Sequence, residues 1–485
     1  MAENKIAKNA TILTVSRVIT LMITLVSSML LSRFRTLTEY GTYSQLIVIV
    51  TLMVSVFSLG LPNSTNYFLA RADTREEKRE FLSVFYTLCT LLCMLMATVA
   101  PFVAPLFSRY FDNPHILDYI YFLAIYPWTQ LTVSNISNVL VVYNKTVKLL
   151  TVNIINAAVS VVAIIIVQLL SLDFSAYMKL FLSGEIAISI WIYAIVYRLE
   201  GSIKPTIKKR WLREILVYSI PIGFASLIST INIEIDKLMI GNFFDTETMA
   251  IYTNSAKELP FYVFATALTA VILPQITIEL KRKEIKRVIS LWSKAVELSY
   301  LVIAFCVMAC IVFAPQIITI LYSEKYLAGV SVFRIYSLSL ILKTTYFGMI
   351  LNASGKTKFV LYSSIISLIL NCVLNYSLFL FFGIIGPAIA TVVSISVIAV
   401  FQLQYSAKIL NVGFCEIFPW SKLAKITLLN CIFGVVLFLI VSLINIGTDI
   451  KGIIFSILIG SIALLTYLLL IKKRAFTIWH ELNGR

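Results

Sequence analysis

The residues of this sequence that could do chemistry are ionisable side chains placed inside long apolar stretches. A charge within a membrane span is costly unless it faces protein or a water-filled cavity, so such residues often mark a transport path. The cations among them predict an anion site. Phosphate suits this set because arginine engages its oxygens bidentately, while lysine acts as a mobile point charge. We expect the wall of a diphosphate-binding cavity to contain Arg17, Lys343, Arg334, Lys257 and Lys237.

Purely structural roles are the alternative for several of these cations. Arg334 lies near enough to the end of its stretch for the side chain to reach the membrane interface. Lys237 follows Asp236, and Lys257 precedes Glu258. Adjacent residues point apart on a helix, so each of these charges could pair with a neighbouring helix instead.

A second set of side chains could hold a coupling cation. Asn371 and Asn375 are four residues apart and share a helical face, and Thr391 follows a Gly-Pro break that can free backbone carbonyls. These are the hard oxygen ligands that sodium prefers, although the two asparagines could instead hydrogen-bond neighbouring helices. Coupling to protons through a carboxylate is a third possibility, with Glu234, Asp236 and Glu258 as candidates.

Three further polar residues are candidates for the lining of the cavity. Glu185 stands inside an apolar stretch and could respond to protons or pair with a cation such as Arg17. Asn135 and Asn156 could face a sugar or simply join two helices. The segment NASGKTK lacks the spacing of a phosphate-binding loop, so ATP-driven transport by this chain is not expected.

The elements that must position these residues follow from the composition. Of the 485 residues, 59% are hydrophobic and 13% are charged, which excludes a soluble multidomain enzyme. A β-barrel is excluded because its strands alternate apolar and polar residues. The sequence therefore predicts an all-α polytopic membrane protein. Apolar runs of ~20 residues indicate about fourteen spans, near 10–32, 42–62, 81–104, 116–141, 147–170, 176–197, 214–240, 248–274, 295–322, 328–352, 358–382, 384–407, 422–446 and 450–471.

The distribution of basic residues predicts the orientation of these spans. The chain has 40 Lys and Arg residues and a net charge of +16. If the N-terminus is cytoplasmic, about 29 of them fall in cytoplasmic segments and about 6 outside, as the positive-inside rule requires. An even number of spans then places both termini in the cytoplasm.

An internal repeat organises the spans into two lobes. Three landmarks recur at an offset of about 210 residues: Thr42-Tyr43 with Ile251-Tyr252, Ala104-Pro105 with Ala314-Pro315, and Asn144-Lys145-Thr146 with Gly355-Lys356-Thr357. We therefore expect a six-helix lobe over residues 1–200, a second over 201–410, and two appended helices with a cytoplasmic tail over 411–485. Two lobes in the same orientation suit alternating access.

Several segments carry a resemblance to a known family. They are RFRTLTEYGTYSQL, LGLPNSTNYFLAR, YSIPIGFASLISTINIEIDKLMIGNFF, IYTNSAKELP, LYSEKY and NASGKTK. With the repeat, this pattern resembles Wzx-type flippases for O-antigen and capsular polysaccharide repeat units, members of the multidrug/oligosaccharidyl-lipid/polysaccharide (MOP) exporter superfamily. The resemblance covers nearly the whole chain. It implies two lobes of six helices that together form a V with a central cavity, and outward movement of undecaprenyl-diphosphate-linked glycans.

The same resemblance implies a place for sodium. In a related branch, the peptidoglycan-lipid flippases, a sodium site is built from spans 7, 11 and 12. The matching residue types here are Asp236, Asn371, Asn375 and Thr391, with Asn375 standing where the family pattern has a second carboxylate. No organic cofactor is implied, and coupling to Na⁺ or H⁺ is expected.

Two other functions are alternatives to glycan flipping. A cation-coupled multidrug antiporter of the same fold needs an acidic or aromatic cavity, whereas the charges expected in the cavity here are largely basic. A membrane glycosyltransferase or polymerase needs a large outer loop with catalytic residues, and the longest outer connection is short. The expectation is therefore a secondary transporter rather than an enzyme. It would be a monomer in the bacterial cytoplasmic membrane, associated with polymerase or ligase machinery and without nucleic-acid partners.

Overall fold

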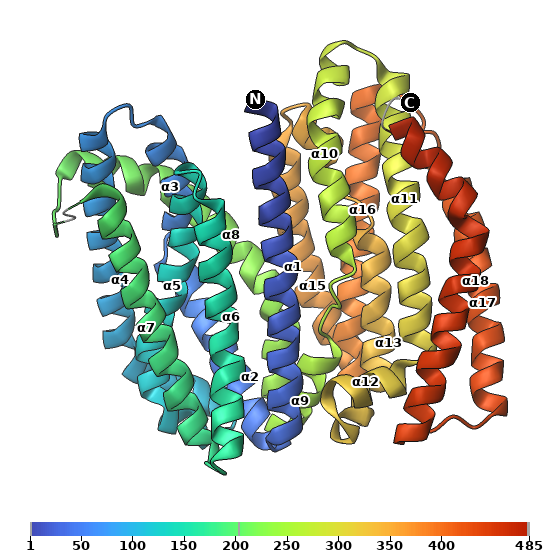
Figure 1. Ribbon diagram of the computed structural model, residues 1–485, viewed down its shortest axis with the longest axis horizontal. Coiled ribbons are helices and arrows are strands. Elements are labelled where there is room, and N and C mark those ends of the chain that lie inside the picture. Colours follow the sequence, from blue (N-terminus) through green and yellow to red (C-terminus); the bar gives the residue numbers. More distant parts are fainter. Residues whose placement is uncertain (1, 202–203, 483–485) are drawn as a thin grey trace. The chain divides into compact units, whose positions relative to one another are not determined.

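The apolar runs of the sequence form long helices in the computed structural model, which describes residues 2–201 and 204–482 (Figure 1). Within the described residues, 12 stretches are long and apolar enough to cross a membrane, and one of them, Lys358–Leu410, contains two helices. The expected class of an all-α, multi-pass membrane protein is therefore confirmed. The chain forms two compact units, residues 1–250 and 251–485.

Within the described residues, the first unit contains eight α-helices, and three of them begin at side-chain caps. At the start of α2, Thr36 accepts from the Glu39 amide while the Glu39 side chain accepts from the Thr36 amide. Asp173 caps α7 through the Ala176 amide at 2.8 Å. Such caps satisfy amides that have no partner in the first helical turn. The bounds are α1 (Ala2–Phe34), α2 (Leu37–Phe57), α3 (Leu61–Arg71), α4 (Arg75–Tyr110), η1 (Pro114–Tyr119), α5 (Ile120–Val142), α6 (Thr146–Leu169), α7 (Phe174–Glu200) and α8 (Lys209–Phe243).

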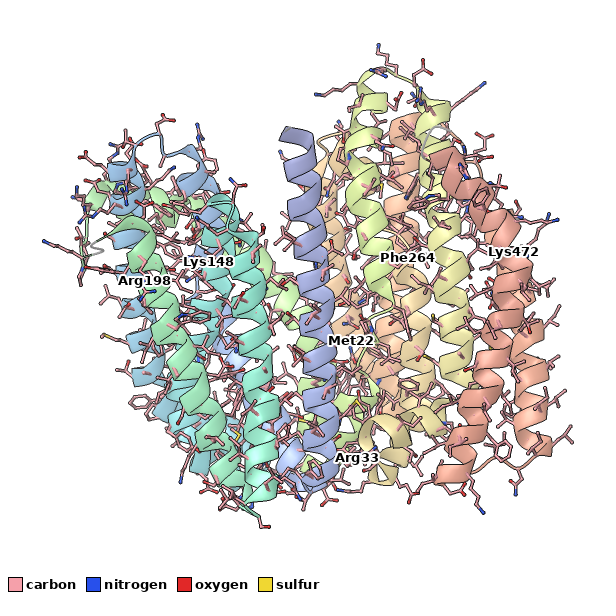
Figure 2. The ribbon with its side chains drawn as sticks, viewed as in Figure 1. Met22, Arg33, Lys148, Arg198, Phe264 and Lys472 are labelled. Carbon is pink, nitrogen blue, oxygen red and sulfur yellow. The ribbon has the colours of Figure 1, made fainter. Side chains whose placement is uncertain are left out.

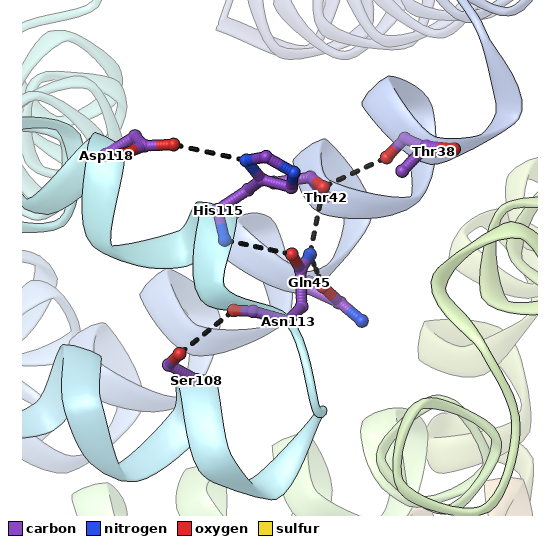
Figure 3. Close-up of polar contacts among 7 residues, drawn as sticks. All are labelled: Thr38, Thr42, Gln45, Ser108, Asn113, His115 and Asp118. Carbon is purple, nitrogen blue, oxygen red and sulfur yellow. Dashed lines mark hydrogen bonds and ion pairs between the residues drawn. The ribbon is translucent and has the colours of Figure 1, made fainter.

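The core of the first unit lies around α5, which packs against α4 and α7, while α6 packs against α1. At one end of the unit, the buried amide of Asn113 joins three segments (Figure 3). Its nitrogen donates to Thr42 Oγ1 at 2.9 Å and to Gln45 Oε1 at 2.6 Å, and its oxygen accepts from the His115 amide. These bonds fix the turn between α4 and η1 onto α2.

The second unit follows the order of α2 to α7 with several of the helices divided, and it ends with two further helices. Its largest fully buried side chain is Trp292. The indole of Trp292 packs against Phe418 and donates to Thr345 Oγ1 at 2.9 Å. The bounds are α9 (Thr246–Ser255, which begins in the first unit), α10 (Tyr262–Lys281), α11 (Ile285–Val312), α12 (Ala314–Tyr322), η2 (Glu324–Gly329), α13 (Val330–Leu338), η3 (Ser339–Lys343), α14 (Met349–Ala353), α15 (Thr357–Phe382), η4 (Gly383–Ile385), α16 (Gly386–Leu410), α17 (Trp420–Leu443) and α18 (Ile450–Leu482).

The structure corrects the expectation that every span is one continuous helix. The stretches 248–274, 295–322 and 328–352 are each divided. In the first, helix α9 ends at Ser255 and α10 begins at Tyr262, with Pro260 between them. Proline has no amide hydrogen and disfavours helical geometry in the residue before it. In the second, Pro315 occupies the first turn of α12, where a missing amide hydrogen costs nothing.

The repeat is visible in the positions where elements begin. Helix α9 starts about 210 residues after α2, and the same offset relates η2 to η1, α13 to α5 and α15 to α6. The cap is repeated as well, because Asp245 Oδ1 accepts from the Thr248 amide at 2.7 Å just before α9.

The boundary between the compact units lies after Ala250, whereas the expected boundary between lobes is residue 200. The difference arises because α8 packs against α2 and α3. Two glycines permit this approach: a Cβ on Gly60 would lie 2.6 Å from the Gly223 amide nitrogen, and Gly60 also has φ +70. Larger residues there would separate the helices.

Candidate functional site

The candidate site is built where two interrupted helices of the second unit meet. Glu258 lies in the non-helical segment between α9 and α10, and Lys343 is the last residue of η3. The Lys343 ammonium donates to both carboxylate oxygens of Glu258, at 2.5 and 2.6 Å. The ion pair therefore joins the two interruptions. Sequence reasoning selected both residues but expected Lys343 inside a continuous helix.

Neighbouring side chains hold this ion pair in place but leave it partly exposed. The Lys343 ammonium lies 5.7 Å from the centre of the Tyr262 ring, in cation–π geometry. Thr345, two residues later, is fixed by the indole of Trp292. The side chains of Lys343 and Glu258 are 37% and 20% exposed. Because the ammonium is accessible, an anion with more charge than one carboxylate could compete for it.

Arg334, the other expected cation of this stretch, has a separate environment. Its Nε donates to the Ile311 carbonyl of α11 at 3.0 Å. It lines a largely apolar groove between α11, α13 and α17, together with Thr427 and Asn430. The guanidinium is therefore tied to the backbone of a neighbouring helix in this structure. Lys257 lies beside Glu258 in the non-helical segment and is half-buried.

In the first unit, the expected cations and two of the expected carboxylates lie on α1 and α8. Arg17 is exposed on α1. Lys237 pairs with Glu234 on its own helix, Nζ to Oε2 at 2.8 Å, rather than with a neighbouring helix. The Asp236 side chain is buried, and its Oδ1 accepts from the Lys237 amide at 2.8 Å. The structure thus brings Glu234 and Lys237 together, a contact that their spacing on one helical face allows.

Glu185 is a buried carboxylate in the core of the first unit. Its Oε1 accepts from Asn156 Nδ2 at 3.3 Å, and among the described residues its Oε2 has no hydrogen-bond partner. The alternative pairing with Arg17 is not formed within the described residues. Asn135 lies elsewhere on α5, where its Nδ2 contacts Cys89 Sγ at 3.3 Å. Asn156 and Glu185 therefore form one polar contact, and Asn135 joins two helices.

The asparagines of α15 form a buried cluster with α16. Asn375 Nδ2 donates to Asn371 Oδ1 at 3.0 Å, and Ser394 Oγ donates to the same oxygen at 3.4 Å. Asn375 Oδ1 is buried without a hydrogen-bond partner among the described residues. Thr391 is half-buried on α16. Sequence reasoning missed Ser394, whose signal was its position one turn after Thr391.

These oxygens fit a sodium ion in chemical type, because amide and hydroxyl oxygens are hard donors. Only neutral donors are present in the cluster, and the described residues contain no group of three or more His, Cys, Asp or Glu that could hold a metal. Asp236, the expected carboxylate of the set, belongs to the other compact unit. Its contribution stays a prediction.

Comparisons with known proteins identify the family of this chain. A family model described as "Polysaccharide biosynthesis protein" matches residues 30–331. The probable low-salt glycan biosynthesis flippase Agl15 of Haloferax volcanii is 25% identical over 238 residues. That alignment covers 48% of this chain, and the chain spans only half the length of this relative.

Solved structures agree on the fold. The inward closed conformation of the lipid II flippase MurJ matches with a TM-score of 0.76 and 18% identity, over 95% of this chain and 98% of that one. An inward-facing multidrug resistance MATE transporter of the MOP superfamily matches with a TM-score of 0.66 and 15% identity, over 81% and 94%. With the MOP fold and a family match over more than half its length, the chain belongs to the polysaccharide biosynthesis protein family.

Proposed function

We propose that this protein flips a polyprenyl-diphosphate-linked oligosaccharide across the membrane by alternating access. Undecaprenyl is the carrier that the resemblance to Wzx-type flippases implies, and an O-antigen or capsule repeat unit is the proposed cargo. The observation that carries the proposal is the accessible Lys343 ammonium at the junction of two interrupted helices. Interrupted helices in transporters commonly form substrate and ion sites near the middle of the membrane.

The proposed role of Lys343 is to exchange one anion for another. Without substrate, Glu258 neutralises the ammonium at 2.5 and 2.6 Å. A diphosphate carries more negative charge than one carboxylate and offers more acceptor oxygens, so it can displace Glu258. The lipid tail stays among the phospholipids while the head group crosses. Arg17 and Lys257 are the other cations we assign to this path, and Arg334 and Lys237 would join only by leaving their present partners.

Orientation and assembly are part of the same proposal. The charge bias of the connections supports cytoplasmic termini in a bacterial inner membrane, and hence movement from the cytoplasmic to the outer leaflet. The chain would act as a monomer that supplies polymerase or ligase enzymes. No catalytic residue is needed, because the transport moves a substrate without breaking a covalent bond.

The experiment reconstitutes the full chain in liposomes with a polyprenyl-diphosphate carrying a fluorescent sugar. Protection of the sugar from a membrane-impermeant quencher reports flipping. Lys343→Met should lower the rate strongly, while Lys451→Met, which removes an exposed lysine of α18, should not. Wild-type flipping by Lys343→Met would reject the proposed role of this residue. Counterflow of a cationic dye without movement of the lipid would instead support the multidrug antiporter.

Coupling to an ion is tested in the same vesicles. We propose sodium coupling at the Asn371–Asn375 cluster, and the buried Glu185 is the proton-coupled alternative. A sodium gradient should accelerate flipping in wild-type protein and in Glu185→Gln, but not in Asn375→Leu. A response to a pH gradient alone, abolished by Glu185→Gln, would replace the sodium proposal with proton coupling.

A further inference from the structure

A groove in the first unit, separate from the candidate site, has the layout of a lipid-binding site. It lies between α4 and α7 and has a volume of about 720 Å³. Pockets for small ligands are typically about 300–1,000 Å³. The start of α4 and the end of α7 lie together, because Arg75 Nε is 3.6 Å from Glu200 Oε2. This contact shows which ends of the two helices share a level.

The lining of the groove changes from charged to apolar along its length. Arg198, labelled in Figure 2, lies near the end of α7 and lines the groove together with Ser83 of α4. Thr87 follows one helical turn deeper. Leu91 and Met94 come last and are 45% and 61% exposed. A charged end, a hydroxyl-bearing middle and an apolar far end are the order of chemical groups in a phospholipid.

The charged end is able to accept an anion. Arg198 is exposed, and no ion pair of the described chain involves it. The nearby carboxylates are already occupied, since Glu200 contacts Arg75 and accepts from the Tyr143 hydroxyl. Glu80 accepts from Lys208 and, at 3.1 Å, from the Trp211 indole.

A second observation in the groove points independently to a ligand. Tyr86 is 4% exposed and lines the groove, and its hydroxyl is buried without a hydrogen-bond partner among the described residues. A buried hydroxyl without a hydrogen-bond partner is unfavourable, so a partner is expected there. An ester carbonyl of a lipid would lie between a phosphate on Arg198 and an acyl chain on Leu91.

We propose that this groove binds one phospholipid with a net negative head group. Its phosphate contacts Arg198, its ester region receives the Tyr86 hydroxyl, and one acyl chain follows Leu91 and Met94. A glycan is disfavoured as the occupant because the deep end is apolar and exposed. A free phosphate would use Arg198 but leave that deep end empty.

Native mass spectrometry of the purified full chain in neutral detergent tests this proposal. Phosphatidylglycerol should bind about tenfold more tightly than phosphatidylcholine, because both carry the phosphate but the choline cation of the second is repelled by the Arg198 guanidinium. Arg198→Gln should bring the two lipids within about threefold of each other. Ala194→Trp, which fills the groove from an exposed position, should weaken both. Arg109→Gln, an exposed arginine at the opposite end of α4, should keep the wild-type preference.

Three outcomes would overturn the proposal. The first is equal binding of the two lipids by the wild-type chain. The second is an unchanged preference in Arg198→Gln together with unchanged binding in Ala194→Trp. The third is displacement of the lipid by millimolar inorganic phosphate, which would identify a site for free anions. Tyr86→Phe adds a matched readout, because it removes one hydroxyl while leaving the charge and the apolar end intact.

Discussion

The fourth span of the first repeat and its counterpart in the second repeat differ in whether the helix is continuous. Helix α5, Ile120–Val142, runs without interruption, whereas its counterpart is divided into α13, η3 and α14. Positions about 210 residues before Lys343 and Glu258 hold Val133 and Ile49. The two repeats therefore share a plan of helices, and among the described residues the Lys343–Glu258 ion pair of the second has apolar side chains at the equivalent positions of the first.

This difference distinguishes the features that both repeats need in order to fold from the features that form the candidate site. Shared features such as the caps and turns recur in both repeats, because any six-helix unit needs its helix ends satisfied. A broken helix exposes backbone groups and needs compensation, so it persists where a cavity or ligand uses it. We infer that the second unit provides the main contacts to the anionic head group.

The largest effect is expected at the ion pair itself. Lys343→Met should lower flipping by about 10- to 100-fold, because a charge-assisted contact contributes roughly 1.5–3 kcal/mol. Val133→Ala, at the equivalent place in the first repeat, should keep most of the rate. The measurement is initial flipping in liposomes.

The double variant Lys343→Met with Glu258→Gln separates folding from transport. It removes the unpaired carboxylate that Lys343→Met leaves behind, so its membrane level should match the wild type. If the double variant also regains full flipping, the charge of Lys343 has no role in transport.

A smaller effect is expected for the polar contacts between α15 and α16 and for those between α1 and α6. Asn371→Leu removes an acceptor for both Asn375 and Ser394, and should lower the free energy of unfolding by about 1–2 kcal/mol. The counterpart in the first repeat is Ser160, which accepts from Ser27 at 2.8 Å. Ser160→Ala should cost less, because it removes one hydrogen bond between helices, from Ser27, and one within its own helix, to the Ala157 carbonyl at 3.1 Å. Equal costs in mixed-micelle unfolding would contradict the comparison.

The repeated helix caps should contribute equally. Thr36→Ala and Asp245→Ala each remove a side-chain acceptor at the start of α2 or α9. Each should lower the free energy of unfolding by about 1 kcal/mol. Thr36→Ser and Asp245→Asn retain an acceptor and serve as controls. A cap variant that leaves stability unchanged in one repeat would show that the two starts are not equivalent.

The smallest effect is expected at the repeated tight turns. Gly355 has φ +71 and Asn144 has φ +54, both in the left-handed region. Gly355→Ala should cost about 1 kcal/mol, because a Cβ is strained there although nothing crowds it. Asn144→Gly should change stability by less than about 0.5 kcal/mol, since asparagine already tolerates this conformation. A cost for Asn144→Gly equal to that of Gly355→Ala would argue against a shared turn.

Much of the architecture could be predicted from the sequence. Long apolar runs must form helices in a bilayer, because a backbone there has no other way to satisfy its hydrogen bonds. The landmarks near Thr42, Ala104 and Asn144 indicated the repeat, and element starts at the same offset agree with it. Individual polar residues such as Glu185 and Asn375 could also be selected, since a buried polar group in an apolar run stands out.

The partners of those residues could not be predicted. Sequence spacing sets which residues share a helical face, but it does not say which other helix that face meets. By sequence alone, Glu258 could pair with a cation on any neighbouring helix. Lys237 could likewise pair within its own helix or with another one. The groove between α4 and α7 had no sequence signal, because its hydroxyls and apolar residues are ordinary in membrane helices.

The sequence alone therefore determined the membrane class, the approximate spans and the duplication, all of which follow from local hydropathy and chain periodicity. The tertiary structure decided that three of the expected spans are divided, that Lys343 meets Glu258 where two of them are interrupted, and that Arg334 donates to the Ile311 carbonyl of α11. These features depend on contacts between residues far apart in the chain. Such contacts form only when packing brings specific helix faces together, and local pattern does not encode that choice.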